Sequence, residues 1–592
     1  MTASAVRRSG LALALSLAAA FAGACGSDSN GGTGTNTPDS GVTETPEAGT
    51  SPGDGGQGPD GSIGPTDGGS TADGGTTDGG HPLEAGTDGG VQPPPPPQDL
   101  AKYVDPLIGT GLALTDGGAI SGGQGGSVFP GADVPFGRVQ WSPDTPNGEP
   151  SGYVYSDTAF TGFSLTHFSG AGCPNNGDIP ILPVLSASET SVGFAHADEH
   201  ATAGYYDVKT SEGVRVELTA TQRAGVGRFT FPAAGGTLLV DASRNSAYNP
   251  IGTITVSGTS LDGTTGSGHF CGSSNFTNLY FHAEVDQPFT TTAAAGAGKV
   301  ALTFAAGTGP VTMKIAISYV SGANAKANLQ AEVGSQSFDA IHTAATAAWN
   351  ARLNAIQVSG GSDDEKTKFY TALYHALLHP NVFSDVNGDY VGFDKTTHNA
   401  KGRVQYANYS GWDIYRSEIQ LLALLYPEVA GDMLQSLVDD AQQCGYFIMW
   451  SQNNADDTVM VGDPGALIMA NGYAFGATNF DQKTTLSILT KPPSANYSCS
   501  NPVVFAPGSP YVYAGYLTDG YYPASASSTL EMSTRDFAVA EYAAAQGDMS
   551  HARVFLQRAG AWRYLITPNA GGAPSLQARL STGAWKTPLM TP

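Results

Sequence analysis

The sequence is poor in charge, and above all in positive charge. Only 13% of its 592 residues are charged, and 27 Lys and Arg stand against 52 Asp and Glu, which gives a formal net charge of −25. Phosphate binding needs clustered Lys and Arg, so this balance argues against a nucleic-acid partner. Clustered carboxylates are suited instead to sugar hydroxyls or to a hard cation such as calcium.

The sequence also lacks a long apolar run. No stretch after the N-terminus reaches the roughly 18–20 apolar residues that a membrane helix needs. Residues 1–25 have the pattern of an export signal, with Arg7 and Arg8 before a short apolar segment and small residues before Cys25. The small residues are typical of a lipoprotein cleavage site, which makes Cys25 a candidate for lipidation; the alternative is ordinary signal-peptidase cleavage. We expect a protein exported to a bacterial cell surface or periplasm, lipid-anchored or secreted.

Cysteine is scarce as well. Four cysteines remain besides Cys25: Cys173, Cys271, Cys444 and Cys499. An oxidising compartment permits disulfides, and four cysteines allow three complete pairings, among which the sequence does not choose. Free buried thiols are the alternative.

Composition and periodicity divide the rest of the chain. Residues 26–98 are rich in Gly, Asp, Thr, Ser and Pro and predict a disordered linker. Residues 99–322 alternate apolar and polar side chains, most clearly at Val311, Met313 and Ile315, which predicts an antiparallel β-sandwich.

The period changes from two to three or four near Asn324. The stripe Phe338, Ile341, Ala345, Trp349, Leu353 and Ile356 predicts an amphipathic helix. We interpret residues 323–365 as linker helices and residues 366–592 as a helical domain, with further stripes beginning at Phe369, Tyr415, Met433 and Ala552. The fold class expected is multidomain, β then α, with a toroid of helix pairs after the sandwich.

Three loops carry candidate binding residues. Residues 169–178 (SGAGCPNNGD) are rich in Gly and amides and contain Cys173 and Asp178; a turn between strands is the alternative. Residues 410–416 (SGWDIYR) place Asp413 and Arg416 on one helical face, beside Trp412. Asp accepts and Arg donates hydrogen bonds to sugar hydroxyls, and Trp stacks on a sugar face; a capping carboxylate with a structural ion pair is the alternative.

The third loop, residues 450–464 (WSQNNADDTVMVGDP), contains Trp450 and Asp463, with solvated loop charge as the alternative. His375 and His379 are four residues apart but lack the acid of a zinc-protease motif, so we interpret them as structural. A G-x-S-x-G nucleophile elbow is missing too.

Taken together, these segments resemble glycoside hydrolase family 92. The resemblance runs from Tyr103 onward and rests on motifs in fixed order: YVDPLIGTG, FPGADVPFGRVQWSPDT, GFSLTHFSGAGCPNNGDI, FYTALYHALLHPNVFSDVNGDYVGFD, SGWDIYR, MLQSLVDDAQQCG, MVGDP, YAFGATNFD and STLEMSTRDFAVA. It implies a β-sandwich followed by an (α/α)6 barrel, with the active site between them. The implied activity is removal of terminal α-linked mannose from oligosaccharides or N-glycans, with inversion and with Ca²⁺ bound to the sugar.

The resemblance also assigns roles. Trp412, Asp413 and Arg416 would line the pocket for the terminal mannose, with Trp450 and Asp463 nearby. The loop holding Cys173 and Asp178 would reach across the domain interface. The general acid (a Glu), the calcium ligands and the Asp base of the family follow the segment GAWKTP, so they would lie beyond Pro592, and Glu531 is not the acid. We therefore expect an incomplete barrel, no catalytic or metal-ligating residue in this sequence, and no hydrolysis by the chain as written.

Two other functions stay open. A surface lipoprotein could hold mannose-rich glycans without cleaving them. Another enzyme of the same architecture, such as a disaccharide phosphorylase, agrees less well with the motifs quoted.

Overall fold

The computed structural model describes residues 96–111, 125–148, 150–293, 298–457, 459–491, 513–567 and 575–586, together with the backbone of a short hairpin, β1 (Leu114–Thr115) and β2 (Gly118–Ala119). The predicted signal peptide with Cys25, nearly all of the predicted linker, and Cys499 lie outside these residues. The chain from Pro97 to Pro592 belongs to one compact unit.

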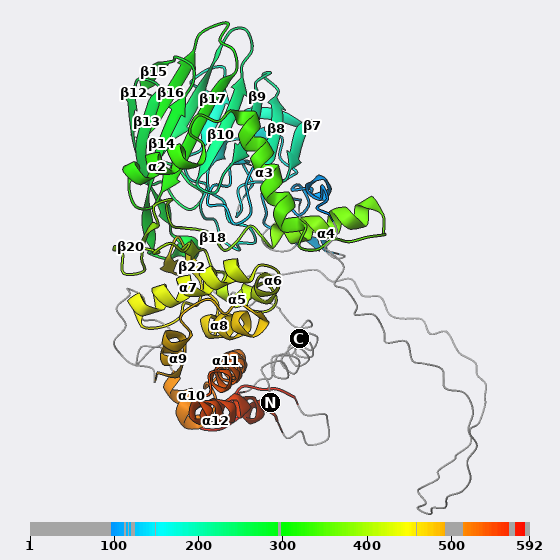
Figure 1. Cartoon of the computed structure of the whole chain (residues 1–592), viewed down its shortest axis with the longest axis vertical. Helices are drawn as coiled ribbons and strands as arrows, with labels where there is room; N and C mark the ends of the chain where they lie inside the picture. Colours follow the sequence, from blue (N-terminus) through cyan, green and yellow to red (C-terminus); the bar gives the residue numbers. More distant parts are fainter. Residues whose placement is uncertain are drawn as a thin grey trace, which may run out of the picture. The chain divides into compact units, whose positions relative to one another are not determined.

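Two antiparallel sheets form the first part of this unit (Figure 1). The nine-stranded sheet has the order β12 (Thr253–Ser257), β13 (Ser260–Gly268), β14 (Phe276–Val285), β17 (Val311–Ser318), β10 (Ala224–Thr230), β9 (Arg215–Ala220), β8 (Tyr205–Thr210), β7 (Val192–Thr202), β4 (Ala159–Phe160). The six-stranded sheet has the order β15 (Thr290–Ala293), β16 (Lys299–Phe304), β11 (Gly236–Asp241), β6 (Ile181–Val184), β5 (Gly162–Ser164), β3 (Ser142–Asp144).

One core lies between the two sheets. Val311, Met313 and Ile315 of β17 alternate inward and are at most 1% exposed. They belong to the same apolar cluster as Leu238 and Val240 of β11 in the other sheet. The period-two pattern thus marks strands that bury one face against a second sheet.

Two helices cover the nine-stranded sheet. Helix α2 (Gly322–Glu332) packs on β17 and β14, and α3 (Phe338–Leu353) packs on β8, β9 and β10. Leu329, Phe338 and Ile341 form a small core with Val226 of β10. The segment interpreted as linker helices therefore lies on the sheet itself.

The remaining helices follow in sequence, so the β-then-α order is confirmed. They are α4 (Asp363–His375), α5 (Gly411–Ile414), α6 (Glu418–Leu425), α7 (Pro427–Cys444), α8 (Pro464–Phe475), α9 (Gln482–Thr490), α10 (Tyr513–Asp519), α11 (Ala526–Ala545) and α12 (Met549–Arg558). Their ends follow local rules: Ser362 and Glu365 form a capping box at α4, and Gly445 ends α7 in the left-handed conformation.

Two predicted helical stripes are divided in the structure. The stripe from Tyr415 to Leu425 breaks between α5 and α6, where Ser417 has a non-helical backbone, the backbone amide of Arg416 donates to the Asp413 carbonyl and its Nε donates to the Trp412 carbonyl. The side chain thus takes the carbonyl that an α-helix would pair with the Arg416 amide. The stripe from Ala552 to Leu565 continues after α12 as a 3₁₀ helix, Ala559–Leu565, where Gly560 disfavours α-helix.

The short hairpin β22 (Ser451–Gln452) and β23 (Ala455–Asp456) lies buried between sheets and helices. Its turn residues, Asn453 and Asn454, both have positive φ, as a two-residue hairpin turn requires. Gln452 Nε2 donates to Asn176 Oδ1 at 2.7 Å, and Asn453 Nδ2 donates to Ser267 Oγ at 2.8 Å. The Tyr319 hydroxyl donates to Asn453 Oδ1 at 2.9 Å.

Arg138 forms a second buried junction. Its guanidinium, 2% exposed, forms an ion pair with Asp385 at 2.9 Å. It also donates to the backbone carbonyls of Ile317 in β17 and of residues 382–384 after α4. Asp385 accepts further hydrogen bonds from Ser318, Asn324 and Asn328. The sheet and the segment after α4 are therefore held by one hydrogen-bonded network.

Candidate functional site

Three residues of the SGWDIYR segment gather around one carboxylate. Trp412 Nε1 donates to Glu531 Oε1 at 3.1 Å, and the Tyr415 hydroxyl donates to Glu531 Oε2 at 3.2 Å. Arg416 Nη2 lies 3.5 Å from Glu531 Oε1, and its guanidinium stacks over the Trp412 ring at 4.4 Å. We call Trp412, Asp413, Tyr415, Arg416 and Glu531 the WDxYR cluster.

Part of the WDxYR cluster is open to solvent. The Arg416 side chain is 40% exposed, and Asp413 is exposed. Donors and acceptors stand next to an aromatic face here, which is the arrangement that binds sugar hydroxyls. The cluster can therefore bind a polyol through hydrogen bonds to Asp413 and Arg416.

Gly462 of the MVGDP motif makes room for Glu531. Its φ is +89°, and a Cβ at this position would lie 3.0 Å from Glu531 Cβ and Oε2. A side chain at residue 462 would therefore be strained and would also press on the WDxYR cluster.

Asp463 itself is engaged elsewhere. It precedes α8, and its Oδ2 accepts from Arg535 Nε at 2.9 Å. Both side chains are nearly buried, at 11% and 8% exposed. Arg535 is one turn from Glu531 on α11, so this ion pair braces the helix that carries Glu531.

Trp450 is buried rather than open to a ligand. It is 3% exposed, stacks on Phe270 at 4.0 Å, and lies 5.3 Å from the Phe168 ring. Its indole nitrogen donates to Ser410 Oγ at 2.8 Å. Ser410 in turn donates to Asp413 Oδ2, so Trp450 is connected to the WDxYR cluster.

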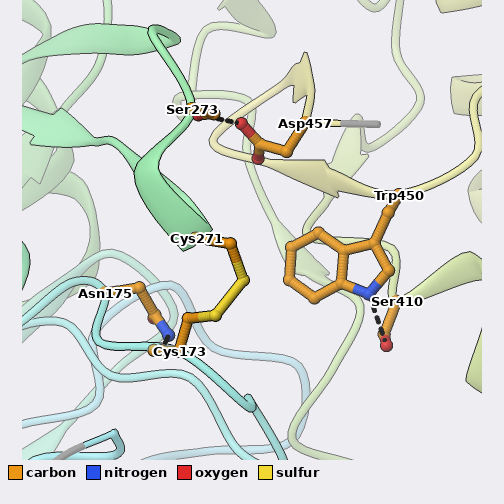
Figure 2. The surroundings of a disulfide bond; sticks show 7 residues. All are labelled: Cys173, Asn175, Cys271, Ser273, Ser410, Trp450 and Asp457. Carbon is orange, nitrogen blue, oxygen red and sulfur yellow. Dashed lines mark hydrogen bonds between the residues drawn. A yellow bond between two sulfur atoms is a disulfide. The ribbon is translucent and has the colours of Figure 1, made fainter. Parts of the chain in front are cut away.

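Cys173 forms a disulfide with Cys271. Figure 2 shows this disulfide beside Trp450, with the indole nitrogen directed at Ser410. Of the three pairings that the sequence allowed, only the one with Cys173 bonded to Cys271 agrees with the structure.

Asp178 lies in the interior. Its side chain is 0% exposed and accepts from Thr166 at 2.7 Å, Ser267 at 2.6 Å and Asn245 at 3.1 Å. Burial raises the pKa of this carboxyl in spite of the three hydrogen bonds. Because Ser267 also bonds Asn453, Asp178 supports the buried hairpin β22–β23 rather than facing solvent.

Burial shifts the pKa values of Asp457, His375 and His379. Burial raises the pKa of Asp457 to about 7, although its Oδ1 accepts from Ser273 at 2.6 Å. Burial lowers the pKa of His375 to about 4 and that of His379 to about 3. Both histidines are therefore neutral near pH 7, and His379 stacks on Phe168 at 4.3 Å.

Glu418 is a further buried carboxyl beside the cluster. Burial raises its pKa from 4.5 to about 8, and the negative charge of Asp413 adds to this effect. In the part of the chain that the structure describes, its Oε1 has no hydrogen-bond partner. The Glu418 residue as a whole is half-buried, whereas its Oε1 atom is enclosed.

The Glu418 shift predicts that stability falls with pH. In the unfolded chain the carboxyl ionises near pH 4.5, whereas the folded protein keeps the proton up to about pH 8. Between these values the folded state holds more protons, so raising the pH favours unfolding. We expect Glu418→Gln to match the parent near pH 4.5 and to be more stable by about 4 kcal/mol near pH 8.

Urea unfolding followed by circular dichroism at both pH values measures this difference. Glu541→Gln, at an exposed position of α11, is the matched control and should leave the pH dependence unchanged. Equal pH dependence in the parent and in Glu418→Gln would contradict a shifted Glu418.

Sequence reasoning missed three residues that the structure brings to the site: Glu531, Ser410 and Glu418. Glu531 had a signal, because it is four residues from Arg535 on a helix whose next turn buries Asp536. A helix that buries several charged residues on one side predicts a polar partner there. Ser410 and Glu418 had no such signal.

Family models match this chain over nearly all of the described range. The glycosyl hydrolase family 92 N-terminal domain matches residues 103–335, and the family 92 catalytic domain matches residues 324–592. The chain belongs to glycosyl hydrolase family 92.

Solved structures of this family are similar. The family GH92 α-mannosidase BT3965 from Bacteroides thetaiotaomicron, in complex with mannoimidazole, has a TM-score of 0.73 at 26% identity, covering 83% of this chain and 67% of that one. The family GH92 inverting mannosidase BT2199 from the same organism has a TM-score of 0.71 at 25% identity, with 83% and 68% covered.

A curated relative matches a smaller part of the chain. A protein of Arthroderma benhamiae, named an uncharacterized secreted glycosidase, is 26% identical over 340 residues, which are 49% of this chain. The match spans 43% of that relative's length.

Proposed function

We propose that this protein acts on glycans that end in α-linked mannose, as an exo-acting glycoside hydrolase. The observation that carries this proposal is the WDxYR cluster, where an exposed Asp and Arg lie beside a Trp that the half-buried Glu531 holds in place. Family membership and the two mannosidases among its solved relatives support it. Mannose-containing oligosaccharides and N-glycans are the proposed partners.

In this proposal Asp413 accepts hydrogen bonds from sugar hydroxyls and Arg416 donates them. Trp412 provides an apolar face, which Glu531 orients through the indole nitrogen. The hydrolytic step would invert the anomeric centre by single displacement, with an acid and a base about 6.5–9.5 Å apart. We also propose that α4–α12 form part of an (α/α)6 toroid.

The family resemblance further implies calcium. Within the described residues no group of three or more His, Cys, Asp or Glu gathers to hold a metal ion. The described residues therefore do not form such a group. Calcium assistance is proposed on the resemblance alone.

The second candidate is glycan binding without cleavage. Both carboxylates of the WDxYR cluster are already held by protein donors: Glu531 by Trp412, Tyr415 and Arg416, and Asp413 by Ser410. Carboxylates held in this way are oriented to accept hydrogen bonds from hydroxyls, which is what binding requires.

We propose export on the basis of residues 1–25, with Cys25 as a candidate lipid anchor. Among the helices described, none is both long and apolar enough to span a bilayer.

Two measurements on the parent chain test these functions. Calorimetry with methyl α-mannoside should show binding, with methyl α-glucoside and methyl α-galactoside much weaker. Mannose release from α-1,2-mannobiose, with calcium or with chelator, then separates the candidates. Release supports the hydrolase, and binding without release supports the glycan-binding protein. Absence of mannoside binding contradicts both, and equal release with calcium and with chelator refutes calcium assistance.

A further inference from the structure

The Cys173–Cys271 disulfide joins loops from the two sheets. Cys173 lies between β5 and β6 of the six-stranded sheet, and Cys271 lies between β13 and β14 of the nine-stranded sheet. The loop at Cys271 contains two non-glycine residues with positive φ, His269 and Cys271 itself. The disulfide therefore fixes a loop whose backbone conformation is unfavourable for non-glycine residues.

This loop presents Phe270 to Trp450. Residues 270–272 form a short 3₁₀ turn, and the Phe270 ring lies parallel to the indole at 4° and 4.0 Å. Phe168, from the loop that carries Cys173, lies on the same aromatic cluster. Both phenylalanines are 2% exposed, so they are placed to hold Trp450 and not to contact a ligand.

A second set of contacts fixes the same loop to the chain after Trp450. Ser273 Oγ donates to Asp457 Oδ1 at 2.6 Å, and Asn275 Nδ2 donates to the Asp456 carbonyl. Figure 2 shows the loop with the disulfide at one end and Ser273 bonded to Asp457 at the other. The loop from the sheets therefore contacts the Trp450 ring through Phe270 and the chain after Trp450 through Ser273 and Asn275.

The Ser410 hydroxyl connects Trp450 to Asp413 by two hydrogen bonds. An indole nitrogen can only donate, so the Ser410 oxygen must accept from Trp450. With its oxygen engaged in this way, Ser410 directs its single proton to Asp413 Oδ2. Consecutive hydrogen bonds of this kind polarise and strengthen one another.

We propose that the disulfide-tied loop positions Asp413 for the sugar through Phe270, Trp450 and Ser410. In this arrangement Trp450 and Ser410 are positioning residues, and Asp413 alone among them touches the mannose. The inference rests on the proposed function, because it assigns a means of orienting the Asp of the same pocket.

Calorimetry with methyl α-mannoside tests the hydroxyl link. Ser410→Ala should weaken binding about 10-fold, the effect of losing one hydrogen bond to a charged group. Ser410→Thr keeps the hydroxyl and should restore most of the affinity. Trp450→Phe keeps the ring stack, removes the N–H, and should also weaken binding several-fold. Ser188→Ala, at an exposed loop position, is the matched control.

The disulfide link is tested without sugar. Hydrogen exchange of the Trp450 indole N–H, measured by NMR, should be about 10-fold faster in the double variant Cys173→Ser/Cys271→Ser than in the parent. Thermal unfolding by circular dichroism shows that each variant is folded. If the double variant does not fold, Phe270→Leu, which removes the stacked ring and keeps the disulfide, provides the same exchange measurement.

The outcomes separate the two claims. If the parent binds the mannoside and both Ser410→Ala and Trp450→Phe bind it equally well, the positioning inference is wrong and the proposed function stands. If the parent does not bind the mannoside, the proposed function fails. Unchanged indole exchange in folded disulfide and Phe270 variants overturns the positioning inference in either case.

Discussion

Arg138→Met is expected to lower the free energy of unfolding by about 3–5 kcal/mol. The substitution removes a guanidinium that is 2% exposed and leaves Asp385, 1% exposed, without its counter-charge. It also removes the guanidinium hydrogen bonds to the carbonyls of Phe383, Ile317 and Ser384, of which the last two keep Asn328 Nδ2 and Arg223 Nε as donors. A buried charge that loses its partner costs far more than the pair contributes when intact.

Urea unfolding at pH 7, followed by circular dichroism, measures this loss. Arg215→Met is the matched control, because Arg215 forms an ion pair with Asp207 at the surface and is 50% exposed. Its removal should cost less than about 1 kcal/mol. A change of similar size in the two variants would show that the Arg138 network does not hold the sheet to the helices.

Asp413→Ala should abolish measurable binding of methyl α-mannoside. A carboxylate that accepts two sugar hydroxyls contributes about 1.5–3 kcal/mol through each hydrogen bond, so the loss of both weakens binding by at least about 100-fold. Stability should change little, because Asp413 is exposed and accepts from the side chain of Ser410 alone among the described residues.

Calorimetry of the folded variant measures this effect. Asp364→Ala, at an exposed position in the first turn of α4, removes the same charge elsewhere and should bind like the parent. Asp413→Asn keeps the shape of the side chain and should still lose most of the affinity. An unchanged dissociation constant in Asp413→Ala would remove Asp413 from the sugar pocket.

The fold was predictable from the sequence wherever one face of an element is buried. The alternation at Val311, Met313 and Ile315 predicted a strand, and these residues lie in β17. The stripe from Phe338 to Ile356 predicted a helix and is α3, which begins at Phe338 and ends at Leu353, one turn before the predicted end. Helix ends set by side-chain contacts were not predictable, as at Arg416, whose guanidinium takes the Trp412 carbonyl.

The arrangement of the site was less accessible to sequence reasoning. Trp412, Asp413 and Arg416 are neighbours in the chain, so their proximity was expected. Their partner Glu531 is more than 100 residues away, and only packing brings it to them. The sequence also did not predict the burial of Asp178 and Trp450. Both lie in Gly- and Asn-rich segments that resemble exposed turns, yet both are buried.

The buried hairpin β22–β23 has a consequence for motion. Ser451, Gln452, Asn453 and Asn454 are at most 2% exposed, and the side-chain amides of Gln452 and Asn453 form hydrogen bonds with Asn176, Ser267 and Tyr319 of the sheet region. Sliding or tilting the sheets against the helices would break these bonds while the amides stayed out of water, at about 1–3 kcal/mol for each group. The sheets and the helices are therefore held in one relative orientation. Access to Asp413 and Arg416 must then depend on side-chain rotamers and surface loops, and not on a rocking motion that opens and closes around the sugar.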